Sequence, residues 1–158
     1  MVIIIIIIGP ISVSRLSNLE YLSLSGNIFN NSILSYVSTL SSLKQLELYE
    51  IGLKGIIDLQ DMPTFKNLES LWMYDTVFNN NFYQIGVMTS LKNLTMWDCT
   101  LKDTLLYPIL PAFKSLKDVE FVSMALNNFP AILNGSCNSL ESLSLTDCNL
   151  TNTLLEQG

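Results

Sequence analysis

Apolar residues recur in one short phrase along the chain. Each copy opens on a leucine, and apolar residues follow at the third and fifth places after it, with one polar or small residue between them in most copies. The intervals between successive openings are 24, 25, 23, 25 and 24 residues, for Leu19, Leu43, Leu68, Leu91, Leu116 and Leu140. A fixed period of this size over six copies predicts a repeat array.

The alternation inside each phrase predicts a short β-strand, because side chains two residues apart point to the same face of a strand. A single strand of this kind cannot bury its apolar face, so the copies must stack side by side as a parallel sheet over one continuous core. Buried centres are expected for six strands, at Leu22, Leu46, Leu71, Leu94, Val119 and Leu143. The predicted shape is a curved solenoid.

Two further columns follow each strand. The first contains Asn27, Ile51, Thr76, Cys99, Met124 and Cys148, and the second contains Phe29, Leu53, Phe78, Leu101, Leu126 and Leu150. From Leu16 to the C-terminus the pattern resembles the leucine-rich repeat, LxxLxLxx(N/C)xL. The resemblance implies an α/β fold, a right-handed leucine-rich-repeat solenoid of about six repeats. A parallel β-sheet would line its concave face, with short helical or irregular turns and flanking strands on the convex side.

In that family an asparagine ladder bonds the backbone of the turns. Asn27 keeps the asparagine, and Cys99 and Cys148 are accepted substitutes. Ile51, Thr76 and Met124 depart from the pattern. We therefore expect some of the turns to be irregular.

The segments after these columns resemble the LxGxIP phrase of the plant extracellular subclass, which adds a second short strand on the flank. They lie at Phe29–Ile33, Leu53–Ile57, Leu101–Leu105 and Leu150–Leu154. The array is therefore most similar to the extracellular region of plant receptor-like proteins and receptor-like kinases. That similarity implies a place on the extracellular face of the plasma membrane, as part of a longer receptor.

Two regions are expected. Residues 1–15 are a low-complexity apolar segment, read as a signal-like core or as a spurious start of the reading frame. Residues 16–158 form the uncapped array. The apolar run Val2–Ile8 is much shorter than the roughly twenty residues of a membrane-spanning helix, so no transmembrane segment is expected. Without the family's paired-cysteine caps, the array is interpreted as an internal fragment of marginal stability.

Composition excludes several classes of function. Fourteen acidic and eight basic residues give a net charge of −6, which disfavours nucleic acid as a partner. The chain has no histidine, no phosphate-binding glycine motif and no credible metal-ligand set, so no cofactor is expected. Cys99, Cys137 and Cys148 are interpreted as buried thiols, and a disulfide between Cys137 and Cys148 is not expected.

The outward positions of the six strands carry the candidate chemistry, with seven acids, five aromatic residues and no base. The first column is Tyr21, Gln45, Ser70, Asn93, Asp118 and Ser142; the second is Ser23, Glu47, Trp72, Thr95, Glu120 and Ser144. The third is Ser25, Tyr49, Tyr74, Trp97, Val122 and Thr146; the fourth is Gly26, Glu50, Asp75, Asp98, Ser123 and Asp147.

Four aromatic residues of these columns fall on three consecutive strands, which predicts one exposed cluster with an acidic rim. Such patches are typical binding surfaces, and the rim favours a basic or amphipathic partner. The predicted ligand-binding residues are Glu47, Tyr49, Glu50, Trp72, Tyr74, Asp75, Trp97, Asp98 and Glu120. The alternative is that these rings only cover neighbouring strands or form a self-association surface.

Two other sets of residues belong to the surface. The column Glu20, Lys44, Glu69, Lys92, Lys117 and Glu141 mostly alternates in sign and predicts a solvated edge. Candidate N-glycosylation sites occur at Asn30, Asn93, Asn134 and Asn149, and the glycan on Asn93 would stand on the concave face.

The resemblance and the concave columns together indicate a non-catalytic recognition module. It would be the ectodomain fragment of a plant cell-surface receptor that binds a peptide or protein in signalling or defence, with a co-receptor as a further partner. The alternatives are a leucine-rich enzyme inhibitor and a segment of an intracellular immune receptor. A remote alternative is a glycan-acting enzyme that uses Asp75 and Asp98, since two carboxylates about 5 Å apart suit a retaining glycosidase.

Overall fold

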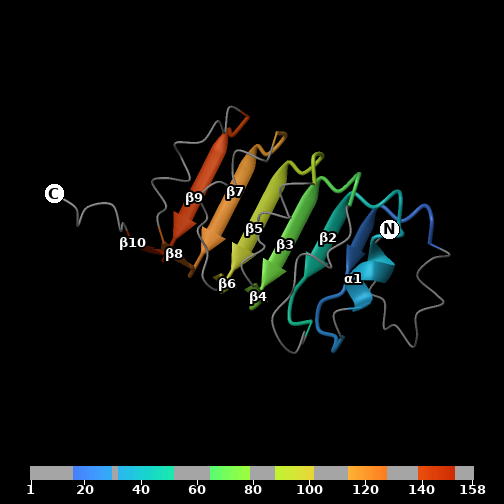
Figure 1. Cartoon of the computed structure of the whole chain (residues 1–158), viewed down its shortest axis with the longest axis horizontal. Coiled ribbons are helices and arrows are strands. Elements are labelled where there is room, and N and C mark those ends of the chain that lie inside the picture. Colours follow the sequence, from blue (N-terminus) through green and yellow to red (C-terminus); the bar gives the residue numbers. More distant parts are fainter. Residues whose placement is uncertain are drawn as a thin grey trace.

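The fold is built around one parallel sheet of six strands (Figure 1). The computed structural model describes residues 16–29, 32–51, 65–78, 88–101, 114–127 and 139–151, and all structural statements concern these. The sheet order is β1-β2-β3-β5-β7-β9. The strands are β1 (Tyr21–Ser23), β2 (Gln45–Leu48), β3 (Ser70–Tyr74), β5 (Asn93–Trp97), β7 (Asp118–Val122) and β9 (Ser142–Thr146).

The register of the sheet confirms the sequence alignment of the repeats. Each expected strand centre pairs with the next, in the order Leu22, Leu46, Leu71, Leu94, Val119 and Leu143. The first five of these side chains are at most 1% exposed. Leu143, on the last strand, is half-buried, and no further described strand packs beyond β9.

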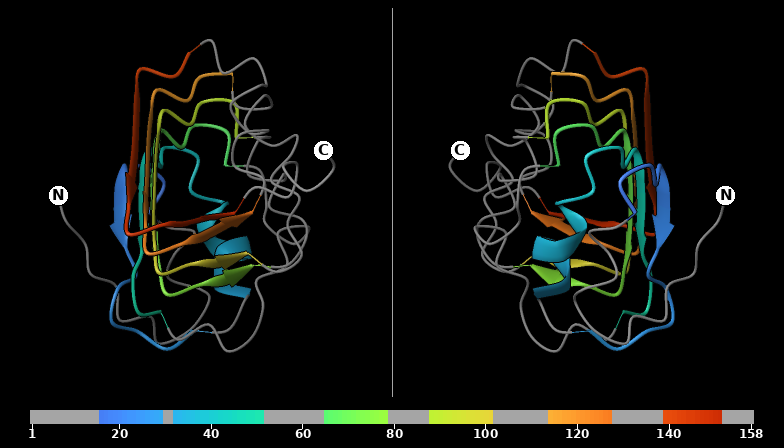
Figure 2. Two further views of the ribbon diagram at one scale, coloured as in Figure 1. Left: turned by 90° about the vertical axis from the view of Figure 1, so that its left-hand side faces the viewer. Right: turned by 90° about the vertical axis from the view of Figure 1, so that its right-hand side faces the viewer.

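A short helix, α1 (Ser32–Val37), lies on the core side of the first strands (Figure 2). Its apolar residues Ile33, Leu34 and Val37 are buried in the core. Val37 follows Leu34 by three residues and Ile33 by four, about one helical turn, so the three side chains share one face of the helix. Short helical turns were expected on this side of the array. No strand is assigned at Phe29, the start of the predicted flanking segment, although its backbone N–H donates to the Ile51 carbonyl at 3.0 Å, and the segment is helical from Ser32.

The later repeats do carry the flanking strands that the resemblance implied. They form two parallel pairs, β4 (Val77–Phe78) with β6 (Thr100–Leu101) and β8 (Ala125–Asn127) with β10 (Asn149–Thr151). Figure 2 shows them leaving the ends of the main strands and running away from the main sheet. The predicted segment Leu53–Ile57 lies outside the described residues, as do residues 1–15.

The turn after each main strand has the same backbone conformation in every repeat. One residue per turn is left-handed, with φ between 48° and 72°: Gly26, Glu50, Asp75, Asp98, Ser123 and Asp147. These are the residues of the fourth outward column. The expectation of irregular turns is therefore wrong, because the turn geometry is kept even where the ladder residue changes.

The residue at the ladder position bonds the turn in some repeats and fills the core in others. Asn27 Nδ2 donates to the carbonyl oxygens of Leu24 and Ser25 at 2.9 and 3.1 Å. In the third repeat the hydroxyl of Thr76 replaces it, donating to the carbonyl of Tyr74 at 3.1 Å. Ile51 and Met124 are buried apolar residues at the same position and fill the core there.

The two ladder cysteines bond in a similar way. Cys99 Sγ lies 3.3 Å from the carbonyl oxygen of Trp97, and Cys148 Sγ lies 3.3 Å from that of Phe121. Both are free thiols. Cys137 lies outside the described residues, so the absence of a Cys137–Cys148 disulfide remains a prediction.

Candidate recognition groove

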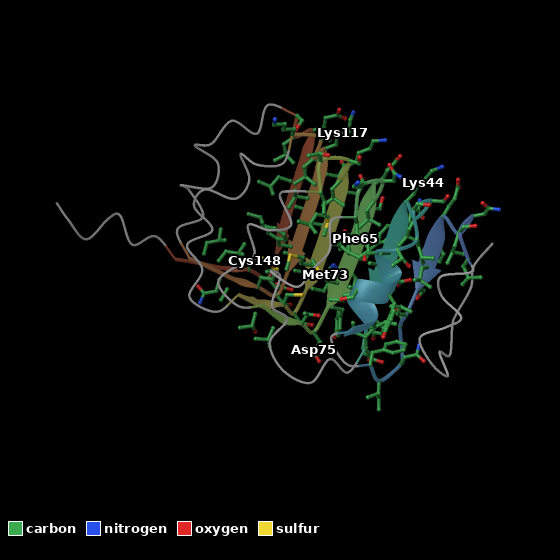
Figure 3. The ribbon with its side chains drawn as sticks, turned by 45° about the vertical axis from the view of Figure 1, so that its right-hand side comes forward. Lys44, Phe65, Met73, Asp75, Lys117 and Cys148 are labelled. Atoms are coloured by element: carbon green, nitrogen blue, oxygen red, sulfur yellow. The ribbon has the colours of Figure 1, made fainter. Side chains whose placement is uncertain are left out.

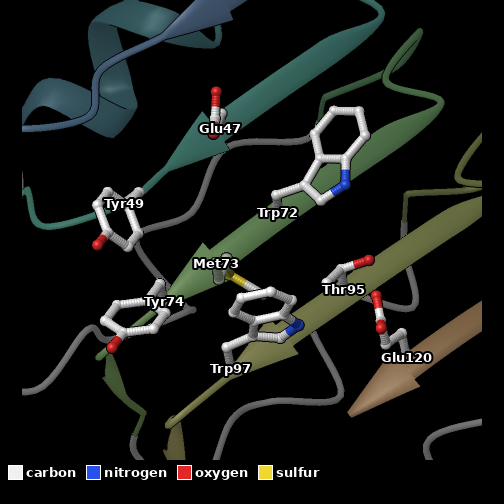
Figure 4. Close-up of a pocket in the computed structure, with 8 residues that line it drawn as sticks. All are labelled: Glu47, Tyr49, Trp72, Met73, Tyr74, Thr95, Trp97 and Glu120. Atoms are coloured by element: carbon white, nitrogen blue, oxygen red, sulfur yellow. The ribbon is translucent and has the colours of Figure 1, made fainter. Parts of the chain in front are cut away.

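The concave face of the sheet contains a groove of about 460 Å³ at its centre (Figure 4). We call it the aromatic groove. Strands β2, β3, β5 and β7 and the residue that follows β2 supply its side chains. The lining residues are Glu47, Tyr49, Trp72, Met73, Tyr74, Thr95, Trp97 and Glu120. The parallel register positions them, because residues of one column project side by side from successive strands.

Three of the aromatic rings form a continuous row. The ring centroids of Tyr49 and Tyr74 are 4.7 Å apart, and those of Tyr74 and Trp97 are 6.4 Å apart with an edge-on arrangement. Tyr49 is 39% exposed and Trp97 is 44% exposed. Trp72 belongs to the neighbouring column and is half-buried, on the other side of the hollow from Trp97 (Figure 4). The row offers solvent-facing ring surface for an apolar or cationic group.

Glu47 and Glu120 stand in the same column as Trp72, near opposite ends of the groove (Figure 4). One oxygen of Glu47, Oε2, accepts a hydrogen bond from the Tyr21 hydroxyl at 2.6 Å. That bond, with burial and the carboxylate charge adding to it, raises the pKa of Tyr21. Tyr21 therefore holds the Glu47 carboxylate in place from the neighbouring strand.

The turn column forms a second acidic row beside the rings. The neighbouring carboxylate of Glu50 raises the pKa of Tyr49, and that of Asp98 raises the pKa of Tyr74. Glu50, Asp75 and Asp98 are exposed. They do not line the groove, but Glu50 and Asp98 lie close enough to two of the lining tyrosines to raise their pKa values.

The structure therefore divides the nine predicted binding residues into two groups. Six line the aromatic groove: Glu47, Tyr49, Trp72, Tyr74, Trp97 and Glu120. Glu50, Asp75 and Asp98 occupy the left-handed turns. Sequence reasoning missed Thr95 and Met73 as lining residues. Thr95 could have been found from the sequence, because it lies between Trp72 and Glu120 in its outward column. Met73 belongs to an inward column, and its sequence position gave no such signal.

Charges on the molecule are separated between the two edges of the main sheet. Figure 3 shows Lys44 and Lys117 at the edge where the strands begin and Asp75 at the edge where they end. The described ion pairs all lie at the first edge, joining Lys44 to Glu20 at 2.7 Å, Lys92 to Glu69 at 2.8 Å, and Lys117 to Glu141. The solvated edge is thus as predicted. Among the described residues, no carboxylate on the concave face is paired with a basic side chain.

Asp75 and Asp98 do not have the surroundings of a glycosidase pair. Both side chains are exposed and both residues hold left-handed turns. A glycosidase needs one carboxyl group kept protonated by an apolar site while its neighbour stays ionised. Asp75 and Asp98 are both exposed and occupy equivalent turns, so their surroundings offer no apolar site for either carboxyl group.

The glycosylation candidates fall in different environments. Asn93 is half-buried on β5, and its Nδ2 donates to Ser70 Oγ at 2.8 Å on the concave face. Asn149 is exposed at the start of β10 on the flank. Asn30 and Asn134 lie outside the described residues.

The described residues contain neither a metal-ligating cluster nor a membrane-spanning helix. No cluster of three or more metal-ligating side chains occurs in the described ranges. Among the helices that the structure describes, none is long and apolar enough to cross a membrane.

Comparisons with known proteins agree with the fold. No protein-family model matches the chain. A stretch of 63 residues is 40% identical to Receptor-like protein 9b of Arabidopsis thaliana, covering 40% of this chain and 7% of that protein. The fold is similar to the crystal structure of internalin C2 from Listeria monocytogenes, with a TM-score of 0.63 and 18% identity, over 89% of this chain and 67% of the other. The leucine-rich-repeat solenoid and the resemblance to plant receptor-like proteins are confirmed.

Proposed function

We propose that this leucine-rich-repeat chain, which resembles plant receptor-like proteins, is a non-catalytic recognition module that binds a peptide or protein ligand on its concave face. The ligand-binding residues are the six groove residues, supported by Glu50, Asp75 and Asp98. In the whole protein the module would face the cell exterior at the plasma membrane and act in signalling or defence.

The aromatic groove is the observation that carries this proposal. Exposed aromatic rings cost free energy in water, and they are enriched where proteins bind partners. Here they lie beside carboxylates that have no basic partner among the described residues, which favours a ligand that brings positive charge. Tyr49 and Trp97 remain 39% and 44% exposed, which counts against the view that they only cover neighbouring strands.

The similarity to Receptor-like protein 9b favours a cell-surface receptor over an enzyme inhibitor or an intracellular immune receptor. The matched stretch covers only 7% of that protein, so the sequence of the rest of the gene is needed to decide between these classes of protein. Full-length transcript sequencing is the direct test: a paired-cysteine cap with a membrane helix indicates the receptor, and an upstream nucleotide-binding module indicates the intracellular class.

A peptide selection tests the recognition function. The immobilised chain is used to enrich binders from a displayed random-peptide library, and the binders are then measured by calorimetry against Trp72→Ala and Trp97→Ala. Truncation of an aromatic anchor at the centre of an interface costs about 2 to 4 kcal/mol, so each variant should bind at least about tenfold more weakly.

Ile28→Ala is the matched control, because Ile28 is an apolar side chain that is 83% exposed and does not line the groove. It should bind as the native chain does. Equal affinity of the selected peptides for all three variants, with circular dichroism unchanged, would remove the groove from the binding site.

A further inference from the structure

The two groove acids fix a distance that a ligand must match. Glu47 on β2 and Glu120 on β7 belong to one column, which runs Glu47, Trp72, Thr95, Glu120 across four neighbouring strands. Three steps of about 4.8 Å between parallel strands separate them by about 14 Å. One cationic side chain therefore cannot contact both carboxylates.

We propose that the aromatic groove binds an extended peptide segment with two basic residues four positions apart and an apolar residue midway between them. This inference rests on the proposed recognition function and specifies the ligand. The segment crosses the strands, one basic side chain reaching Glu47, the other reaching Glu120, and the apolar side chain filling the hollow between Trp72 and Trp97.

The geometry of an extended chain meets these three points. Its rise is about 3.3 to 3.4 Å per residue, so residues four apart are about 13 Å apart, close to the separation of the two acids. Residues two apart point to the same side, so the first, third and fifth side chains all face the groove. In an α-helix residues four apart are separated by only about 6 Å, which is too short.

The middle of the groove suits an apolar side chain. Tyr74 and Trp72 are half-buried there, and Trp97 exposes nearly half of its surface to solvent. Covering these rings removes apolar area from water, which is the main favourable contribution at interface centres.

The ends of the groove suit guanidinium groups. Glu47 has one oxygen held by Tyr21, and neither Glu47 nor Glu120 is ion-paired within the described residues. Arginine combines pairing to a carboxylate with stacking on aromatic faces. Trp72 is the cross-strand neighbour of Glu47, and Trp97 lies on β5, the strand next to that of Glu120.

A second copy of the chain is a poorer occupant. Its concave face would bring acids against acids, and the net charge of −6 adds a general repulsion. The lysines Lys44, Lys92 and Lys117 are already paired with glutamates at the edge of the sheet. A separate basic peptide has neither disadvantage.

Two synthetic peptides of identical composition test the spacing. The first is acetyl-Gly-Arg-Ser-Leu-Ser-Arg-Gly-amide, with the arginines four apart, and the second is acetyl-Gly-Arg-Ser-Arg-Ser-Leu-Gly-amide, with the arginines two apart. Binding to the 158-residue chain is followed by tryptophan emission, since Trp72 and Trp97 are its two tryptophans and both line the groove. The first peptide should bind about two- to fivefold more tightly, the value of one exposed ion pair.

Variants locate the effect. Glu47→Gln and Glu120→Gln keep the side-chain shape and should each bring the ratio of the two affinities close to one. Asp118→Asn removes the same charge from an exposed position on β7 that does not line the groove, and the ratio should persist. Weaker binding of the first peptide at high salt is also expected.

Three results would contradict the proposed four-residue spacing of the basic residues in the ligand. They are equal affinities for the two peptides, a preference that survives both glutamine variants, and no binding of either peptide. If library-selected peptides still depend on Trp72 and Trp97 in any of these cases, the recognition function stands and only the ligand pattern is wrong. If no peptide depends on the tryptophans, the recognition function fails as well.

Discussion

Cys99 illustrates how different side chains can serve at the ladder position. Its thiol is 3% exposed and lies within hydrogen-bonding reach of backbone carbonyl oxygens, where Asn27 uses an amide and Thr76 a hydroxyl. Burial raises the pKa of the thiol from its ordinary value of 9.0 to about 11. The neutral thiol is therefore the form that the fold accommodates.

This pKa predicts a specific loss of stability in alkali. The folded-state pKa lies above the unfolded one, so the contribution is complete below pH 9.0 and is lost as the pH rises to about 11. Over that range the native chain should lose about 2 kcal/mol more unfolding free energy than Cys99→Ala, whose tyrosines titrate in the same way. Urea unfolding at a series of pH values measures both, and parallel curves would contradict the prediction.

At this scale the sequence predicted the positions of side chains better than their bonds. Leucine spacing was sufficient to place Leu22 and Leu94 inside and Trp72 and Trp97 outside, because a two-residue period admits one register over a buried face. The bond from Thr76 was not predicted, since a hydroxyl near a carbonyl leaves no pattern in the sequence.

Among the elements, the turn shows the clearest link from residue type to geometry. Left-handed φ favours glycine, with asparagine and aspartate next. The column accordingly contains Gly26, three aspartates, a glutamate and a serine, all between 48° and 72°. This column was available in the sequence, but its preference for glycine and aspartate was interpreted only as an acidic rim.

Substitutions of Gly26 test that explanation. A Cβ on Gly26 meets no atom within 4 Å, so any cost is backbone strain at φ +72° and not a clash. Gly26→Val should destabilise the chain by about 1 to 2 kcal/mol, and Gly26→Asp by clearly less. Chemical denaturation of the two variants provides the comparison. The same loss in both would mean that the turn does not select its residue.

The segment after the first main strand shows how a family phrase can hide a local periodicity. Phe29–Ile33 was matched to a family phrase, yet Ile33, Leu34 and Val37 are spaced for a helix, and α1 buries all three. The competing helical period was present in the sequence. A resemblance to a worn motif is weaker than a periodicity that buries a whole face.

Across the whole molecule, burial decreases toward the last strand. Leu94 in the middle of the sheet is 1% exposed, whereas Leu143, at the same repeat position on β9, is half-buried. Repeat arrays are stabilised by contacts between neighbours, and β9 has only β7 beside it among the described strands. The opposite edge of the sheet differs, because Leu22 on β1 is 0% exposed.

The same substitution at two equivalent positions should therefore differ in cost. Leu94→Ala should destabilise the chain by about 2 to 5 kcal/mol, as is usual for a buried leucine, and Leu143→Ala by about 1 kcal/mol or less. Thermal or urea unfolding monitored by circular dichroism gives both values. Equal losses would indicate that β9 is packed as tightly as the centre.

The candidate site depended on the whole assembly of strands. Sequence alignment of the repeats predicted which columns face the concave side, and the structure brings six of the nine predicted binding residues to one groove. The remaining three could not be distinguished in advance, because the left-handed turns direct Glu50, Asp75 and Asp98 past the edge of that groove.

The strict register also bears on how such a chain changes over generations. Inward columns such as Leu46 and Leu71 keep the solenoid together, while outward columns such as Trp72 and Thr95 contribute little to its core. Mutation can therefore rewrite the outward set one residue at a time without a penalty in folding. New ligand specificities can then arise by point mutation in the outward columns, while the inward columns maintain the fold.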